Sequence, residues 1–434
     1  MNTESASSAE IKSAQVLGPV GTSERIDSID VLRGVAVLGI LSINIFGFAL
    51  PSMASLNPSV MGPLSQADWI AYFVAWFALE GSQRAIFSML FGAGVILFTS
   101  RIMASERAIF GKRLYYRRTL WLIAFGLIDA YILFWPGDIL FHYGLAGLLL
   151  YFMRDWTPRK LLTLAGIIFA VLALVRILLM FSMALMEGFA DSPDAAERLN
   201  MTEEQFEDFQ MTMGHVDPEY VQQEIEERSS GFVSAFIPNA EISFKNQTVN
   251  TIVMLFWDVL MLMLIGMALY RWRVLDASRS LRFYVCMAIG GLAVGYSVNL
   301  WEISYSFAND FWVAYFFWTY DIGRIATGLG YIGVVMLICK LQIWSIVRNS
   351  LAAVGRMALT NYVMHTLICN TIFIGFGLFG SLGIAQMYIV VASIWIAQLL
   401  YSPWWLSKFK YGPLEWLWRK LTYGKLAQKT ISMR

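Results

Sequence analysis

The chain has 434 residues, of which 58% are hydrophobic and 15% are charged, and its formal net charge is +1. Soluble globular domains are nearer half apolar and a quarter charged, so this composition predicts a membrane protein. The basic residues form no stripe, which argues against a nucleic-acid partner. The three cysteines are isolated and have neither metal-ligand nor disulfide spacing, so we expect no metal site and no bound cofactor.

The apolar segments predict an all-α bundle. The first 24 residues are polar and rich in Ser and Ala, which indicates a disordered tail without a cleavable signal peptide. A spanning helix needs about 20 mostly apolar residues, and on this basis we expect about ten spans. The predicted spans are 31–50, 69–99, 119–135, 139–153, 161–185, 248–270, 282–301, 311–339, 350–376 and 384–405.

The loops between the spans alternate in charge, and this alternation predicts the orientation of the chain. Five loops hold 22 Lys and Arg between them, whereas the four short loops on the opposite side hold none. We therefore expect an even number of spans with both termini in the cytoplasm. The basic loops are 101–118, 154–160, 271–282, 340–348 and 408–434, and the opposite loops are 51–68, 135–138, 302–310 and 377–383.

One long loop is strongly acidic. Residues 187–247 carry 14 Asp and Glu against 3 Lys and Arg, and we expect them to form a small helical cap outside the cell membrane. The predicted organisation is therefore a disordered cytoplasmic tail (1–24), a membrane half of five spans (25–186), the acidic cap (187–247), a second half of five spans (248–405) and a basic cytoplasmic tail (406–434).

Two pairs of opposite charges lie within the two longest predicted spans, where charges usually face a partner or a cavity. Glu80 and Arg84 are four residues apart, and Asp321 and Arg324 are three apart, so each pair shares one face of a helix. Either each pair neutralises itself so that the helix can insert, or it forms part of the wall of a midplane cavity. The charges also indicate that these two helices are broken or strongly tilted.

Three further charges fall near the middle of separate spans. They are Arg176, Asp129 and Asp258. Because an unpaired charge at this depth is costly, we expect Arg176 to neutralise one or both of the two carboxylates. Structural pairing is the favoured interpretation of all three residues.

Asp138 and His142 are the candidate catalytic pair. They are four residues apart at the predicted outer end of the fourth span, so the carboxylate is placed to orient the imidazole as a general base. The alternative is structural. Asp138 follows Pro136-Gly137 and would then cap the helix, and His142 would hydrogen-bond to a neighbouring helix.

Polar residues on two other spans also have both a functional and a structural interpretation. Asn361 and His365 share a helix face and either bind a ligand or join two helices. At the predicted cytoplasmic end of the first span, Asp30 and Arg33 are one turn apart. They either neutralise each other, or Arg33 binds a phosphate through its forked guanidinium. Asn44 lies three turns further along the same helix and needs a partner.

Five phrases of the sequence together resemble the YeiB family of bacterial inner-membrane proteins, whose second half is a domain of unknown function. The resemblance covers about residues 25–425 and implies the plasma membrane of a bacterium, without an established reaction. The phrases are IDVLRGVA at 29–36 with Asn44, FSMLFGAG at 87–94, GDIL at 137–140 with Tyr143, GRMALTNY at 355–362, and GPLEWLWR at 412–419.

The opening helix is also distantly similar to that of integral-membrane acyltransferases such as heparan-glucosaminide N-acetyltransferase. Those enzymes carry an acyl group from cytoplasmic acyl-CoA to an acceptor on the far side, and a His just beyond the first helix is the expected transfer residue. Here residues 50–64 contain no His. The YeiB pattern does not require His142 or His365, so the resemblance favours other site residues, namely Asp138, Arg33, Asn44, Arg356 and Asn361.

Three functions remain open at this stage. The first is an acyltransferase in which Arg33 or Arg356 binds acyl-CoA, Asp138 with His142 activates an envelope glycan or lipid acceptor, and Glu80 with Arg84, or Asn44, polarises the carbonyl. The second is a transporter of a small molecule. The third is a scaffold or sensor whose cap 187–247 binds an envelope partner. All three imply contact with membrane lipids.

Overall fold

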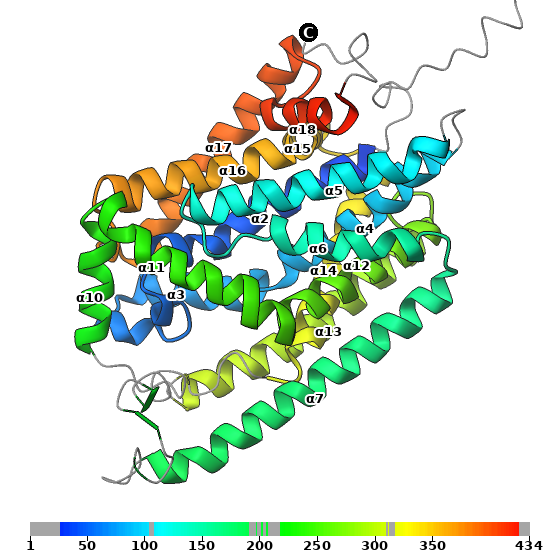
Figure 1. Cartoon of the computed structure of the whole chain (residues 1–434). Helices are drawn as coiled ribbons and strands as arrows, with labels where there is room; N and C mark the ends of the chain where they lie inside the picture. The colour runs from blue at the N-terminus through cyan, green and yellow to red at the C-terminus, as the bar shows by residue number, and fades with distance from the viewer. Residues whose placement is uncertain are drawn as a thin grey trace, which may run out of the picture.

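The computed structural model describes residues 27–103, 108–190, 218–309 and 317–424, together with a few single positions between these ranges. Throughout these residues the chain is helical, which confirms the predicted all-α class (Figure 1). Seven helices of this part are long and apolar enough to cross a membrane, and there is an eighth if a bent pair counts as one span. The chain is therefore a multi-pass membrane protein, but the expected number of about ten spans is not confirmed.

Two of the ten predicted spans account for most of this difference. Helix α5 (Ala108–Tyr131) is long enough, but its first half carries Lys112, Arg113, Arg117 and Arg118. Helix α6 (Leu140–Met153) has only 14 residues, which amounts to about 21 Å at 1.5 Å per residue. A hydrocarbon core is about 30 Å thick, so α6 is too short to cross it alone.

Helix α2 (Asp27–Ala49) lies at the centre of the bundle and packs against α4, α15, α16 and α17. Its contact with α15 is very close, because a Cβ at Gly34 would lie 2.0 Å from the carbonyl oxygen of Leu351. A Cβ at Gly355 would lie 1.9 Å from the carbonyl oxygen of Asp30. The glycines of two of the YeiB-like phrases thus allow these helices to cross. The four neighbours are α4 (Ser82–Met103), α15 (Ser345–Arg356), α16 (Ala358–Asn370) and α17 (Ile384–Lys408).

A second group of helices packs beside α4. Gly92 of α4 and Gly266 of α12 lie directly against the backbone of the other helix. A Cβ at Gly92 would lie 2.0 Å from a carbonyl oxygen of α12, and a Cβ at Gly266 would lie 1.9 Å from a carbonyl oxygen of α4. Helices α13 and α14 pack against each other, and α7 runs along the edge of the bundle (Figure 1). The bounds are α7 (Pro158–Ala190), α12 (Phe256–Arg271), α13 (Leu281–Ala308) and α14 (Tyr320–Lys340).

The two longest predicted spans have different outcomes. The span predicted at 69–99 is broken: α3 (Gln66–Val74) continues into a π-helical turn (Ala75–Leu79) and ends at Glu80, whose ψ of 131° is extended. Gly81 has a φ of +66°, a conformation that glycine adopts readily, and α4 begins at the next residue. The span predicted at 311–339 is shorter than expected, because its helix begins only at Tyr320.

The predicted acidic cap is described only in its second part, and residues 191–217 lie mostly outside the described residues. Helix α10 (Pro218–Ser229) lies across the end of the bundle (Figure 1). There Glu224 accepts hydrogen bonds from Ser52, and Arg228 forms a buried ion pair with Glu224 at 3.2 Å. Burial lowers the pKa of Arg228. Helix α11 (Phe232–Lys245) instead starts a 40-residue helical segment that reaches Arg271.

The end of the described chain forms a short helix, α18 (Pro413–Tyr423), where a basic tail was expected. It packs against α5 and α16. The Glu415 carboxylate accepts hydrogen bonds from the backbone N–H of Leu359 at 2.7 Å and of Thr360 at 3.1 Å, and thereby caps the start of α16. It also accepts the Thr360 hydroxyl proton at 2.6 Å. Burial raises the pKa of Glu415, an effect that these hydrogen bonds oppose.

We predict that Glu415→Ala lowers the free energy of unfolding by about 2 kcal/mol, because loss of a side-chain cap leaves helix N–H groups without an acceptor. Thermal unfolding of the purified protein in detergent measures the change. Glu241→Ala is the matched control, since Glu241 is an exposed acid of α11. Equal stability of the two variants would contradict the capping role.

Candidate functional site

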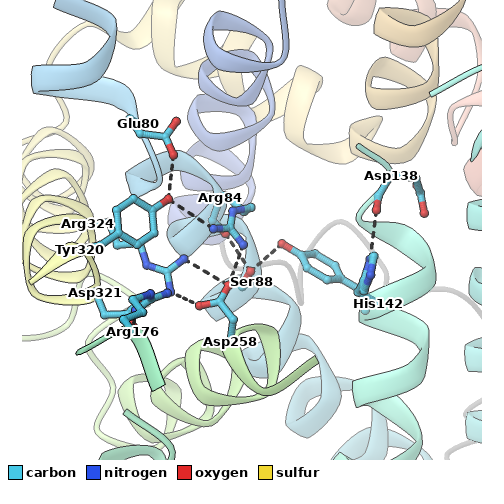
Figure 2. A network of polar contacts seen from close by, with 11 residues as sticks. Glu80, Arg84, Ser88, Asp138, His142, Arg176, Asp258, Tyr320, Asp321 and Arg324 are labelled. Atoms are coloured by element: carbon cyan, nitrogen blue, oxygen red, sulfur yellow. Dashed lines mark hydrogen bonds and ion pairs between the residues drawn. The ribbon is translucent and has the colours of Figure 1, made fainter. Parts of the chain in front are cut away.

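A buried network of five charged residues joins four helices in the interior of the bundle (Figure 2). Asp258 of α12 pairs with Arg84 of α4 at 2.6 Å and with Arg324 of α14. Asp321 of α14 pairs with Arg324 and with Arg176 of α7. All the side chains except that of Arg84 are at most 5% exposed. The network therefore links α4, α7, α12 and α14.

The pairing of Arg176 differs from the sequence-based prediction. We expected it to neutralise Asp129 or Asp258, but its partner is Asp321. Asp258 is neutralised instead by Arg84 and Arg324. The charges alone showed that partners were needed. Only the packing of α7 against α12 brings Arg176 to Asp321 of α14.

The helix break separates Glu80 from Arg84, so these two residues do not form the intrahelical pair that their spacing suggested. Glu80 accepts a hydrogen bond from the Tyr320 hydroxyl at 2.7 Å, while Arg84 turns to Asp258. Within the described part of the chain, no basic side chain forms an ion pair with Glu80. Asp321 and Arg324 do contact each other, as their spacing suggested.

A small, partly open pocket ends on this network. Its polar lining includes the carboxylates of Glu80 and Glu302, and Arg324 lies at its inner wall. Its apolar lining is largely aromatic. The lining residues are Tyr72, Trp76, Glu80, Asn299, Glu302, Ile303, Ser306, Phe311, Phe317, Tyr320 and Arg324.

The pocket lies towards the end of the bundle that the sequence places outside. Tyr72 and Trp76 follow the start of α3, which comes directly after the predicted outer loop 51–68. Ser306 lies near the end of α13, at the next predicted outer loop.

Asp138 and His142 adopt the structural alternative. The Asp138 carboxylate accepts hydrogen bonds from the backbone N–H of Leu140 at 3.1 Å and of Phe141 at 2.8 Å, at the start of α6. His142 Nδ1 lies 3.1 Å from the Asp138 backbone oxygen (Figure 2). Its Nε2 lies 2.9 Å from the Thr251 hydroxyl. The carboxylate therefore does not orient the imidazole, and both ring nitrogens are engaged.

Asn361 and His365 join α16 to α17. The Asn361 amide donates to the Ser402 hydroxyl at 3.2 Å, and His365 Nε2 lies 2.9 Å from Gln398 Oε1. Gln398 in turn donates to the Asn361 backbone oxygen at 3.0 Å. This arrangement is the helix-to-helix bonding that polar groups form in membranes, and neither residue lines the pocket.

The remaining predicted residues lie on or near α2, away from the lining of the pocket. Arg33 pairs with Asp30 at 2.9 Å and is partly exposed. Arg356 ends α15 at the same end of the bundle, since Gly355 touches Asp30. Asn44 is half-buried, about 16 Å further along α2 by helical rise. The structure does not bring Arg33 and Arg356 together with Glu80 in one pocket.

Sequence reasoning missed several polar residues of the pocket, among them Tyr320 and Glu302. Tyr320 is hidden in an aromatic-rich segment that we treated as part of a longer span. Glu302 directly follows the predicted span 282–301 and was treated as a loop residue. The available signal was an acid directly after a predicted apolar span. If the helix continues for another turn, this acid belongs to the helix and can point into the bundle.

The chain is similar over nearly its whole length to proteins from bacteria. It is 33% identical to "Uncharacterized protein YeiB" of Escherichia coli (strain K12), with 92% of this chain and 96% of that protein aligned. It is 30% identical to "Uncharacterized protein YxaH" of Bacillus subtilis (strain 168), with 95% and 99% aligned. Residues 269–425 match the family model "Protein of unknown function (DUF418)". No solved structure matches the chain. The chain belongs to the YeiB family, which confirms the resemblance.

We predict that Arg176 and Asp321 are energetically coupled. Arg176→Met should destabilise the protein by about 3–5 kcal/mol, because it removes one partner of a buried charge cluster. Asp321→Asn should destabilise the Arg176→Met variant by less than it destabilises the unaltered protein. The difference between the two effects is a coupling energy of about 1–3 kcal/mol. Unfolding of the two single variants and the double variant in detergent completes the cycle. Additive effects would show that this contact does not hold α7 in place.

Proposed function

We propose that this member of the YeiB family is an acyltransferase of the bacterial inner membrane. It transfers an acyl group from cytoplasmic acyl-CoA to an acceptor that enters the pocket from outside. The observation that carries the proposal is the position of Glu80. This carboxylate lines a pocket, has no ion-pair partner among the described residues, and lies beside a tyrosine hydroxyl and an arginine.

Glu80 is suited to act as a general base. Its Oε1 accepts from Tyr320, and no described residue donates to its Oε2, which leaves this oxygen for an acceptor's hydroxyl or amine. The acceptor oxygen or nitrogen attacks the thioester carbonyl as its proton passes to Glu80. The carbon–sulfur bond then breaks, and the CoA thiolate leaves and takes up a proton.

Arg84 supplies the electrostatic part of the reaction, while the Tyr320 hydroxyl donates its hydrogen bond to Glu80 and positions that carboxylate. Arg84 is 28% exposed at its side chain, and one of its N–H groups lies 3.5 Å from the Tyr320 oxygen. Donors that are fixed before the reaction stabilise the negative charge that develops on a carbonyl oxygen. The ion pair of Arg84 with Asp258 fixes the guanidinium in this position.

The distance between the two ends of the proposed site is compatible with an acyl-CoA donor. A Cβ at Gly39 of α2 would lie 2.5 Å from the side chain of Gln83, which is the third residue after Glu80. Gly39 is six residues from Arg33, or about 9 Å by helical rise. A donor whose phosphates bind Arg33 therefore needs to reach about two helical turns into the membrane to the level of Gln83, and further to Glu80.

This proposal replaces the catalytic pair considered from the sequence. Asp138 and His142 are engaged in local hydrogen bonds and do not line the pocket. The sequence analysis assigned Glu80 and Arg84 to polarising the carbonyl. In this proposal Glu80 is the general base and Arg84 is the electrostatic stabiliser.

Transport of a small molecule is the second candidate, and the helix break favours it. Interrupted helices with charged groups near the membrane midplane are typical of transporter sites. The break at Glu80 and Gly81 lies beside the pocket, and the ion network connects it to α7, α12 and α14. A transporter moves its ligand unchanged and has no requirement for CoA, which separates the two candidates.

We predict that CoA and acetyl-CoA stabilise the purified protein in detergent. A ligand present at 100 times its dissociation constant stabilises the folded state by about 2.7 kcal/mol, which appears as a higher midpoint of thermal unfolding. Arg33→Ala should lose this stabilisation. Arg113→Ala is the control, because Arg113 is an exposed arginine at the same predicted side. No shift at millimolar ligand with a folded protein would refute the donor site.

We also predict that Glu80→Gln lowers acyl transfer by a factor of about 10²–10⁴, the usual contribution of a general base. The variant should keep the stabilisation by acetyl-CoA, since Arg33 is unchanged. Release of CoA thiol from acetyl-CoA, with a panel of amino and hydroxyl acceptors in the presence of the reconstituted protein, measures the reaction. Unchanged activity in Glu80→Gln, with Glu241→Gln as control, would exclude Glu80 as the base.

A further inference from the structure

The charges around the pocket do not balance. The buried network contributes three arginines and two aspartates, which leaves one positive charge. The pocket adds the carboxylates of Glu80 and Glu302. With all groups ionised, the described site therefore carries one excess negative charge in a region where uncompensated charge is expensive. A ligand with a single positive charge would neutralise it.

The two pocket carboxylates come from different helical segments. Glu80 lies at the break between α3 and α4, and Glu302 lies on α13. Each accepts a hydrogen bond from a hydroxyl group, of Tyr320 and Thr319 respectively. In the described part of the chain neither is paired with a basic residue, so both retain capacity to accept hydrogen bonds from a cation.

The rest of the pocket wall suits an organic cation. Tyr72, Trp76, Phe311 and Phe317 line it together with Tyr320. The Tyr72 ring centroid lies 5.6 Å from that of Trp76 and 5.8 Å from that of Phe311, so these rings form a continuous surface. Aromatic faces attract cations, and the attraction is stronger where water is excluded. A neutral polyol would gain little from either feature.

We propose that the pocket binds the ammonium group of a small primary amine between Glu80 and Glu302, with the carbon chain against the aromatic wall, and that this amine is the acyl acceptor. The proposal rests on the acyl-transfer function above and names its substrate class. It also explains why the pocket contains two carboxylates where a base requires one.

The reaction with an amine balances without any further reactant. An alkyl ammonium is charged near neutral pH and must lose a proton before it can attack. Glu80 accepts that proton, the nitrogen–carbon bond forms, and the carbon–sulfur bond breaks. The nitrogen sheds two protons in total: one is taken up by the CoA thiolate, and the other leaves through Glu80 to water. Glu302 retains the cation and is a positioning residue.

Ligand binding to the full-length protein in detergent, without CoA, tests the ammonium site. The probes are ethanolamine and its neutral counterpart ethylene glycol, and glucosamine and its counterpart glucose, with sodium chloride added to equal ionic strength. We expect the two amines to raise the unfolding midpoint with saturation and the neutral compounds to leave it unchanged. This comparison uses the unaltered chain, so it does not depend on the folding of a variant.

Glu302→Gln should raise the apparent dissociation constant for the amines at least tenfold, while Glu241→Gln on α11 should not change it. Equal effects of amines and neutral compounds, or no effect of either, would overturn the proposal. CoA-dependent acylation of hydroxyl acceptors alone would overturn it as well, but would leave the acyltransferase function intact. Amine binding without any CoA-dependent acylation would refute the acyltransferase function, and the ammonium site would stand.

Discussion

The burial of the Arg324 guanidinium is the constraint on which the membrane-embedded structure depends. Its side chain is 1% exposed and lies between Asp258 and Asp321. Removing a partner from such a cluster costs several kcal/mol, so α12 and α14 have to pack with these carboxylates in contact. Arg84 and Arg176 complete the same cluster from α4 and α7. The charges that look unfavourable for insertion thus determine which helices are neighbours.

The pocket is a consequence of this packing. Arg84 points to Asp258 from the first turn of α4, and the helix before it is interrupted at Gly81, which has a positive φ. The break leaves Glu80 outside the ion network, and among the described residues the Tyr320 hydroxyl is its hydrogen-bond donor. A continuous helix would have placed Glu80 one turn below Arg84, where the two charges would neutralise each other. The break therefore converts a potential ion pair into an available carboxylate.

Several of the YeiB-like phrases mark helix contacts. Gly34 and Gly355 allow α2 and α15 to cross, and Gly92 allows α4 to contact α12. Glu415 of the last phrase caps α16 at Leu359 and Thr360, which belong to another phrase. The proposed reactive group, Glu80, lies outside all five phrases. The phrases that carry the resemblance to the family thus lie at helix contacts, while the candidate site follows from the geometry of the pocket.

The sequence by itself determined the helical class, the positions of most apolar segments and the family, because these depend on local composition and on short phrases. It also showed which charges needed partners. Which partner each charge has was decided only by tertiary structure: Arg176 meets Asp321 through the packing of α7, and Asp138 caps α6 while His142 contacts Thr251. Spacing of three or four residues predicts contacts only along a continuous helix. The helix break at Gly81 and the crossing of separate helices are set by packing between segments far apart in the chain.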